Sequence, residues 1–440
     1  MRLLFRVALS SVYLAVVLVP LWLALSVKRP AGANPAYDVS LATGLVALSL
    51  LFVTFLLPKR MRWLSRALGI DVVLGVHRLV GMSALGFVLL HAATVFAADT
   101  DNLALLDLRT APWRARAAVG ATVALLLLVS SSVWRSKLIK RYESWRAVHV
   151  VLALTVLVLT GLHVWLLRHL VMQSPFRLWF TALAVIVLVA SVHRWVWRAL
   201  HAWRRPYVVD EVRSESPTVS TLVLHPVEHR GMRRFKPGQF AWIRMGSTPL
   251  GFEEHPFTIA SAPDPTGAVQ FTVKQLGDFS GGIGDISAGD RVWVDGPHGA
   301  FTPDHHDATG LVLIAGGVGI TPMISILRSL AQRGDDRTHV LFASANAHEE
   351  LLFRDEIAEI STTIDLEVVE LLDRPHHGWA GRSGFITAEV LAAHLPSPRR
   401  RARLDYFLCG PPPMVTAVSA ALRSLGIPEV RIHTEKFDFV

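Results

Sequence analysis

The sequence contains very little cysteine: Cys409 is the single one among 440 residues. One cysteine excludes a disulfide within the chain and any Cys-x-x-Cys metal site. Internal repeats, low-complexity tracts and the acidic loop pattern of calcium sites are also absent from the sequence. No added regulatory module is therefore visible.

Acidic residues are scarce in the first half of the chain. Residues 1–206 carry 23 Lys or Arg but 6 Asp or Glu, a net charge of +17, whereas the rest carries 21 against 29, or −8. A hydrophobic fraction of 52% is too high for an ordinary soluble protein. The basic residues gather in short connections between apolar runs, which is typical of membrane proteins and not of nucleic-acid-binding proteins. We therefore expect membrane lipid, and no nucleic acid, among the partners.

Six apolar runs are long enough to cross roughly 30 Å of hydrocarbon. They fall near residues 5–27, 39–57, 72–98, 114–133, 146–168 and 176–197. The first has the composition of a signal peptide, but no small-x-small cleavage site follows, so we interpret it as a retained helix. The strongly basic connections, residues 58–66, 134–146 and 194–205, face the cytoplasm under the positive-inside rule. This orientation predicts a multi-pass protein of the cell membrane, with everything after Pro206 in the cytoplasm.

Two further regions with different sequence patterns follow the membrane segment. Residues 207–303 consist of short β-rich runs broken by Gly and Pro, which predicts an antiparallel β-barrel. Residues 304–440 alternate strand and helix, which predicts a doubly wound α/β domain. The expected architecture is thus an α-helical membrane bundle of six helices (residues 1–206) fused to these two domains.

Four histidines lie inside the predicted membrane helices. His77 and His91 belong to the third helix and His149 and His163 to the fifth, and each pair is 14 residues apart. Fourteen residues rise about 21 Å and fall only about 40° short of four turns, so each pair shares one helix face with one imidazole near each leaflet. Histidine in lipid is costly and requires a partner, and imidazole is an axial ligand of haem iron. The spacing predicts two bis-histidine b haems, an inner one on His77 and His149 and an outer one on His91 and His163. The alternative, packing or proton-relay histidines, requires the same spacing twice by coincidence.

Two motifs in the β-rich region suit an aromatic ring system and an anion. HPFTIAS (residues 255–261) is a predicted strand in which an aromatic side chain and a hydroxyl are adjacent, and VKQLGDFSGGIG (residues 273–284) contains Lys274 and Ser280 among glycines. Backbone amides and hydroxyls at such a turn bind phosphate. Each motif alone is more typical of ordinary strands and turns, so their order along the chain carries the argument.

Two more motifs follow predicted strands of the α/β region. AGGVGITP (residues 315–322) opens a helix, and its glycines allow backbone amides to approach a pyrophosphate. LCGPPPM (residues 408–414) places Cys409 and Gly410 at the carboxyl edge of the sheet, where α/β proteins bind ligands. A buried structural cysteine is an equally good interpretation of Cys409.

These motifs, together with PGQF, GPHGAF and the terminal EKF, occur in the order of the ferredoxin-NADP reductase superfamily. With the histidine pairs, the whole chain resembles the NADPH oxidase and ferric reductase family, most of all its short prokaryotic members. The resemblance implies an FAD cradle and a nicotinamide-nucleotide site. The FAD contacts would be His255, Pro256, Phe257 and Thr258, with Lys274, Gly277 and Ser280 near the ribityl or phosphate portion; the pyrophosphate contacts would be Gly316, Gly317, Gly319 and Thr321. Cys409, beside Gly410, would border the nicotinamide, and Phe437, or else Phe439, would shield the flavin.

The resemblance also implies an activity: electrons pass from NADPH or NADH through FAD and two haems to oxygen, which gives superoxide. A ferric or other metal reductase with the same relay is one alternative, and a membrane-anchored reductase that feeds a partner protein is another. No obligate protein partner is expected. SANAHEE (residues 344–350) stands where NADP-preferring relatives often carry Arg, so the choice between NADPH and NADH as electron donor stays open. Val95 and Leu167 stand one turn beyond the outer histidines, where some oxidases have a polar group, so the acceptor also stays open between oxygen and ferric iron.

Overall fold

The computed structural model describes residues 11, 13–22, 35–59, 69–139, 141–167, 174–246, 248, 254–276 and 278–435. The chain divides into two compact units, Met1–Arg198 and Ala199–Val440. The first is helical, and the second contains two β-sheets.

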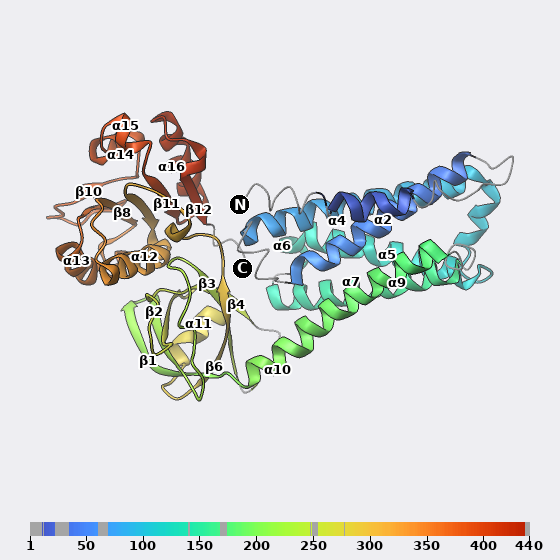
Figure 1. Ribbon diagram of the computed structural model, residues 1–440, viewed down its shortest axis with the longest axis horizontal. Helices are drawn as coiled ribbons and strands as arrows, with labels where there is room; N and C mark the ends of the chain where they lie inside the picture. The colour runs from blue at the N-terminus through green and yellow to red at the C-terminus, as the bar shows by residue number, and fades with distance from the viewer. Residues whose placement is uncertain are drawn as a thin grey trace. The chain divides into compact units, whose positions relative to one another are not determined.

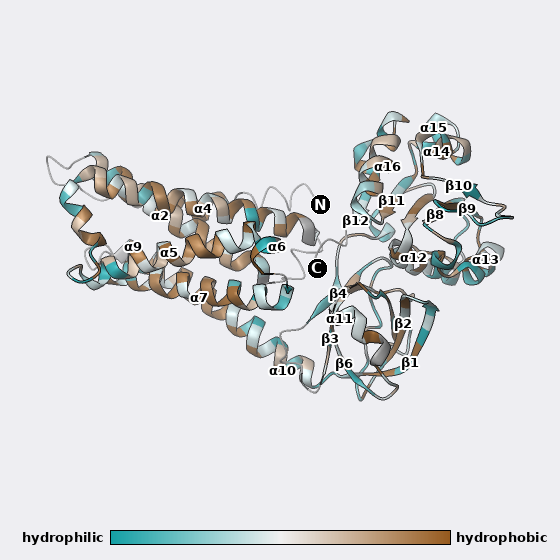
Figure 2. Cartoon of the chain, turned by 180° about the vertical axis from the view of Figure 1, so that it is seen from behind, coloured by the Kyte–Doolittle hydropathy of each residue, from teal (hydrophilic) through white to brown (hydrophobic). Residues whose placement is uncertain are grey.

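Unit 1 consists of long apolar helices. They are α2 (Pro35–Leu56), α4 (Ile70–Ala98), α5 (Trp113–Val133), α7 (Tyr142–Leu166) and α9 (Ser174–Val192), which continues through a π-helical turn, η3 (His193–Trp197). The next helix, α10 (Arg198–Trp203), begins at the last residue of unit 1 and otherwise belongs to unit 2. Short pieces connect them: η1 (Leu57–Lys59), η2 (Thr100–Leu106) and α6 (Arg135–Leu138). Figure 2 shows brown, apolar residues along most of these helices. Large apolar side chains such as Leu79, Val151 and Leu188 are more than 60% exposed, and an apolar surface of this extent suits contact with lipid tails and not with water.

Five helices in the described residues are long and apolar enough to cross a membrane. The prediction of six spans is therefore not met by this part of the chain. The predicted first span, residues 5–27, lies largely outside the described residues, and its described portion, Tyr13–Trp22, is a shorter apolar helix. Ten residues rise only about 15 Å, which is half of the hydrocarbon thickness.

The helices pair in the order of the chain. α2 packs along α4 and α5 packs along α7, and these pairs are visible side by side in Figure 1. Leu50, Val80 and Ala84 form the buried contact of the first pair, and Ala124, Leu125 and Val156 that of the second. Small residues at these contacts allow close approach, which drives helix association where lipid removes the hydrophobic effect.

The first sheet of unit 2 is antiparallel, as predicted. Its strands are β1 (Tyr207–Ser216), β2 (Val219–Pro226), β3 (Phe240–Met245), β4 (His255–Thr258), β5 (Val269–Lys274) and β6 (Arg291–His298), in the order β4-β3-β6-β1-β2-β5. Two short helices, α11 (Asp278–Gly281) and η4 (Gly282–Asp285), follow β5. An isolated bridge between Ile259 and Phe271 links the end of β4 to β5 at the other edge. Among the described residues this is the single β-bridge between the two edges of the sheet, β4 and β5. Closure of the sheet into a barrel therefore stays a prediction.

The second sheet is parallel and covered on both faces, which confirms the predicted α/β class. Its strands are β7 (Leu311–Gly316), β8 (His339–Ala345), β9 (Leu366–Leu372), β10 (Arg382–Ser383), β11 (Asp405–Cys409) and β12 (Ile432–Glu435), in the order β10-β9-β8-β7-β11-β12. One face carries α12 (Ile320–Arg333) and α13 (Arg354–Thr363), and the other carries α14 (Ala388–His394) and α16 (Pro412–Ser424) (Figure 1). Alternate residues of each strand serve opposite cores: Leu313 packs with α12, and Ile314 with α16. Short pieces complete the domain: η5 (Pro303–His305), η6 (Gly317–Gly319), η7 (His348–Glu350), α15 (Pro398–Arg401) and η8 (Glu429–Arg431).

One arginine of α12 joins the two sheets. Arg328 donates from Nη1 to the carbonyl oxygen of Ala260 (2.8 Å) and to Oε1 of Gln270 (3.0 Å), both in the antiparallel domain. Its Nε and Nη2 form a bidentate pair with Glu356 of α13 (2.6 and 2.7 Å). The geometry is the fork that makes arginine-carboxylate pairs strong and directional. Both domains of unit 2 are thereby packed as one body.

We expect Arg328→Ala to lower the free energy of unfolding of unit 2 by about 2–3 kcal/mol, because it leaves the partly buried Glu356 carboxylate and the Ala260 carbonyl without their donor. The measurement is the thermal unfolding of the full-length protein followed by flavin fluorescence. Arg423→Ala is the matched control, since Arg423 and Glu429 also form a bidentate pair but both side chains are more than half exposed, and exposed pairs contribute little. Equal losses in the two variants would contradict the assigned role of Arg328.

Candidate functional site

The four membrane histidines lie at two levels between the two helix pairs. His77 and His149, from α4 and α7, have ring centroids 6.3 Å apart with planes inclined at 56°. Two imidazoles that bind one metal through bonds of about 2 Å have ring centroids roughly 6 Å apart. The separation of this pair would therefore suit two imidazoles that bind one metal ion between them.

Each of the four imidazoles is held at Nδ1 by the helix that precedes its own. Nδ1 of His77 donates to the carbonyl oxygen of Thr54 (3.0 Å) and that of His91 to the carbonyl oxygen of Ser40 (2.8 Å), both on α2. On α5, His163 donates to the carbonyl oxygen of Arg114 (2.9 Å), and His149 lies 3.1 Å from Oγ of Ser132. A hydrogen bond at Nδ1 fixes the ring and the tautomer in which Nε2 binds a metal.

The second level surrounds a cavity. His91 and His163 both line it, and the remaining wall is mostly apolar, with residues such as Leu48, Leu125 and Val156. The cavity has a volume of about 120 Å³. Gly44 lies against His91: a Cβ at this glycine would be 2.9 Å from Nδ1 of the imidazole. A larger residue at position 44 would therefore displace the ring.

The predicted flavin contacts lie on the edge strand β4. His255 and Thr258 are buried, whereas Pro256 and Phe257 are half-buried, and the strand pairs with β3 so that Thr258 faces Phe240. Oγ1 of Thr258 has no hydrogen bond among the described residues although it is buried. A buried hydroxyl without a partner costs about 1–3 kcal/mol, and the polar edge of a flavin supplies such a partner. This strand therefore fits FAD.

The other predicted flavin contacts are only partly within the described residues. Lys274 ends β5 opposite Val219 and is half-buried. Oγ of Ser280, in α11, accepts a hydrogen bond from the backbone N–H of Leu276 (2.9 Å), so it closes the turn between β5 and α11. Gly277, Phe437 and the alternative Phe439 lie outside the described residues.

The predicted nucleotide contacts meet at the point where the strand order of the parallel sheet reverses. From β7 the chain continues to β8 and β9 on one side, and later returns to β11 on the other. Gly316 ends β7 and Cys409 ends β11, and the register pairs Cys409 with Ala315. Ligands of doubly wound sheets bind at this crevice beyond the carboxyl ends of the strands.

Glycine is required here because two backbone segments touch. A Cβ on Gly319 would lie 2.3 Å from the carbonyl oxygen of Cys409, and a Cβ on Gly410 would lie 3.1 Å from Cα of Gly316. Gly317 has φ +53, which favours glycine. Thr321 is buried, and its hydroxyl donates to the carbonyl oxygen of Val318 (3.0 Å), so its side chain holds the turn. Cys409 is fully buried at this edge.

Several residues that hold these sites were missed in the sequence. Nothing in the local pattern identifies Ser132 or Thr54 as partners of histidines, since they lie 17 and 23 residues away and on other helices. Arg328 gives a weak signal, as a charged residue within the apolar run ISILRSL. Ser325, one turn before it, donates to the carbonyl oxygen of Ser261 (2.9 Å) and gives no signal.

Three segments match known protein families. Residues 43–160 match the ferric reductase like transmembrane component, residues 219–302 an FAD-binding domain, and residues 313–420 the oxidoreductase NAD-binding domain. The first segment contains all of α4 and α5 and three of the four paired histidines. The second segment contains the antiparallel sheet except β1, and the third contains most of the parallel sheet but not β12.

Curated relatives match about half of this chain or less. The reductase component of propane 2-monooxygenase from Rhodococcus jostii is 32% identical over 238 residues, which are 52% of this chain and 62% of that protein. NADH-cytochrome b5 reductase 1 of Aspergillus terreus is 35% identical over 184 residues, 40% of this chain and 62% of that protein. The chain thus spans about three fifths of the length of these relatives.

A solved structure with a similar fold is the flavohem-like FAD/NAD binding domain of nitric oxide dioxygenase from Vibrio cholerae O1 biovar El Tor. It is 25% identical, covers 53% of this chain and 98% of its own, and has a TM-score of 0.47.

The membrane component, the FAD-binding domain and the NAD-binding domain follow one another in a single chain. The oxidoreductase signature in the second unit and the histidine-bearing helices in the first therefore belong to one polypeptide. The chain has the architecture of the NADPH oxidase and ferric reductase family, with a ferredoxin-NADP reductase-type region.

Proposed function

We propose that this chain transfers electrons from NAD(P)H through FAD and two bis-histidine b haems to an acceptor on the other side of the membrane. The observation that carries the proposal is the set of four imidazoles at two levels, each held at Nδ1 and with the His77 and His149 rings 6.3 Å apart. When bound, the haems supply one-electron redox steps without an open coordination position. The protein supplies the ligands, their orientation and the apolar surroundings.

Charge supports the direction of transfer. Arg135 stacks over Trp145, whose ring lies 5.1 Å from that of His149, so a basic segment accompanies the His77 and His149 level. Asp99 and Asp101 instead follow the end of α4 that carries His91. Under the positive-inside rule, the first level is cytoplasmic and the second faces outward. A sixth span near residues 5–27, placement in the cell membrane, and a cytoplasmic domain region from residue 207 complete the proposal.

The protein side of the flavin reaction involves positioning only. Pro256 and Phe257 would line the flavin ring, Thr258 would offer its hydroxyl, and Lys274 and Ser280, with Gly277, would hold the ribityl or phosphate portion. Gly316, Gly317 and Gly319 would allow a pyrophosphate to approach the start of α12, and Cys409 and Gly410 would border the nicotinamide. Phe437 would shield the flavin in the absence of the nicotinamide. No acid or base is needed for hydride transfer.

Molecular oxygen is the acceptor that we favour, with superoxide as the product. The cavity around His91 and His163 is lined mostly by apolar side chains, with Thr122 and Thr160 also among its lining residues. A neutral diatomic molecule enters such surroundings at little cost, whereas a charged ferric chelate loses its hydration. The second candidate, a ferric reductase, uses the same relay and passes the electron at the cavity mouth.

A first prediction concerns the relay. His91→Ala should remove about half of the b-type haem absorbance and stop reduction of an external acceptor, because one of two iron sites loses an axial ligand. Reduction of FAD by NADH should continue. His193→Ala is the control, since His193 lies in η3 outside both pairs and its loss should leave the haem spectrum unchanged. External reduction that survives in His91→Ala would instead favour an anchored reductase that feeds a partner protein.

A second prediction concerns tuning by Ser132. Oγ of Ser132 donates to the carbonyl oxygen of Leu128 (2.7 Å) and accepts from His149, so Ser132→Ala makes the imidazole a weaker donor to the metal. One midpoint potential should rise by roughly tens of millivolts, as measured by spectroelectrochemical titration. Ser131→Ala is the matched control, because Ser131 also bonds the Leu128 carbonyl (3.0 Å) and makes no hydrogen bond to a histidine among the described residues. Equal shifts in both variants would count against this role.

A third prediction separates the acceptors. In membranes supplied with NADH, reduction of cytochrome c should be abolished by superoxide dismutase if oxygen receives the electron. Reduction that is insensitive to the dismutase and is replaced by Fe(II) formation from a ferric chelate would establish the ferric reductase instead. Both assays use the same preparation, so differences in haem loading cannot explain the result.

A further inference from the structure

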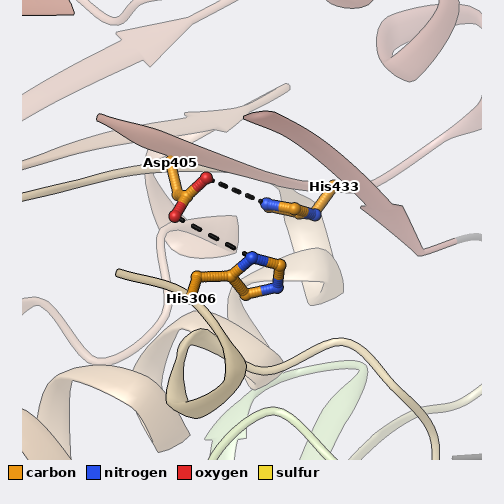
Figure 3. Close-up of side chains that lie close together, drawn as sticks. All are labelled: His306, Asp405 and His433. Atoms are coloured by element: carbon orange, nitrogen blue, oxygen red, sulfur yellow. Dashed lines mark hydrogen bonds and ion pairs between the residues drawn. The ribbon is translucent and has the colours of Figure 1, made fainter. Parts of the chain in front are cut away.

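Two histidines and an aspartate converge in unit 2, away from the nucleotide edge of the parallel sheet. Figure 3 shows the three side chains directed toward one another: His306 from the segment after η5, Asp405 from the start of β11 and His433 from β12. Nε2 of His433 lies 3.2 Å from Oδ1 of Asp405, and Nδ1 of His306 lies 4.0 Å from Oδ2. One ligand atom from each residue lies within 4.8 Å of the other two.

The cluster is at the amino ends of the strands. Asp405 begins β11 and Cys409 ends it, and four residues of a strand span about 13 Å. His306, Asp405 and His433 therefore lie at the edge opposite the glycines and Cys409. The nucleotide site makes no use of these three residues.

The chemistry of the cluster is that of a metal site. Asp405 is fully buried, while the two histidine side chains are only 15% and 17% exposed. Two imidazole nitrogens and one carboxylate form a borderline ligand set that suits divalent first-row transition metals.

We propose that His306, Asp405 and His433 bind a divalent transition-metal cation, with water completing the coordination. The proposal is independent of the haems and of electron transfer. A bound ion would connect the segment that joins the two sheets to β11 and β12.

The spacing of the ligand atoms supports an ion between them. Two ligands at about 2.0–2.1 Å from a tetrahedral metal are roughly 3.3 Å apart, and the two measured distances to Asp405, 3.2 and 4.0 Å, bracket this value. The longer distance, 4.0 Å between His306 and Asp405, exceeds the ligand spacing, and a shift of His306 by less than about 1 Å closes it.

Arg431 competes with a bound cation for the carboxylate of Asp405. Its Nη1 lies 3.3 Å from Oδ2 of Asp405 and also 3.3 Å from the carbonyl oxygen of Asp307. Charge-assisted hydrogen bonds of this kind are usually about 2.7–2.9 Å, so the Arg431 contact is long. A cation at Asp405 displaces the guanidinium, which keeps Asp307 as a partner and is 30% exposed to water. Removal of Arg431 should therefore strengthen metal binding.

Zinc chloride is the probe, added to full-length detergent-solubilised protein from which any affinity tag has been removed. Isothermal titration should give one zinc ion per chain, and His306→Asn and His433→Asn should each weaken binding by at least about tenfold. Arg431→Gln should strengthen it. His376→Asn is the control: His376 belongs to a separate exposed group, with its ring 5.2 Å from that of His348, and its loss should leave the tight zinc site unchanged.

Thermal unfolding provides a second measurement. Zinc should raise the unfolding midpoint of the wild type by about a few degrees through preferential binding to the folded state, and this rise should vanish in His306→Asn. The midpoint of His306→Asn without zinc tests whether the variant is folded. Zinc binding that His376→Asn weakens as much as His306→Asn, or that needs millimolar zinc, would overturn the proposal.

Discussion

Four hydrogen bonds from histidine Nδ1 atoms hold the membrane unit in a form that can position metal ligands. His77 and His91 reach back to α2, and His149 and His163 reach back to α5. The early histidine of each helix bonds the late part of its partner helix and the late histidine bonds the early part, so each pair is antiparallel and tied at two heights. In hydrocarbon no water can replace these partners, so the same bonds that satisfy the imidazoles also fix their orientation.

The second unit meets a comparable demand for fixed geometry. The proposed hydride transfer requires two ring systems to be held in contact distance and in a fixed orientation, and the proposed flavin and nicotinamide contacts lie on the antiparallel and the parallel sheet, respectively. Arg328 and Ser325, both on α12, bond backbone carbonyls at Ala260 and Ser261 just beyond β4. The helix that starts at the glycine turn is therefore anchored directly to the strand that carries Thr258.

The two ends of the strands in the parallel sheet carry chemically different residues. Its carboxyl edge contains close backbone contacts, with Gly319 against Cys409 and Gly410 against Gly316. Its amino edge contains the buried Asp405 with His306 and His433. Strands of five to seven residues keep these edges more than about 10 Å apart, so a cation at one edge can stabilise the domain without entering the electron path.

The sequence by itself determined the hydrophobic pattern and secondary-structure class of each region and the spacing of the histidines, because hydrophobic runs and helical periodicity depend only on neighbouring residues. It placed the glycine motifs after strands for the same reason. The tertiary structure alone decided which side chains meet. Ser132 and His149, Thr54 and His77, Arg328 and Ala260, and His306 and His433 are separated by 17 to 127 residues, and no local pattern encodes their contact. These long-range contacts depend on how helices and sheets pack after they have formed. The predicted first span, for the most part, and the predicted C-terminal aromatic residue lie outside the described residues.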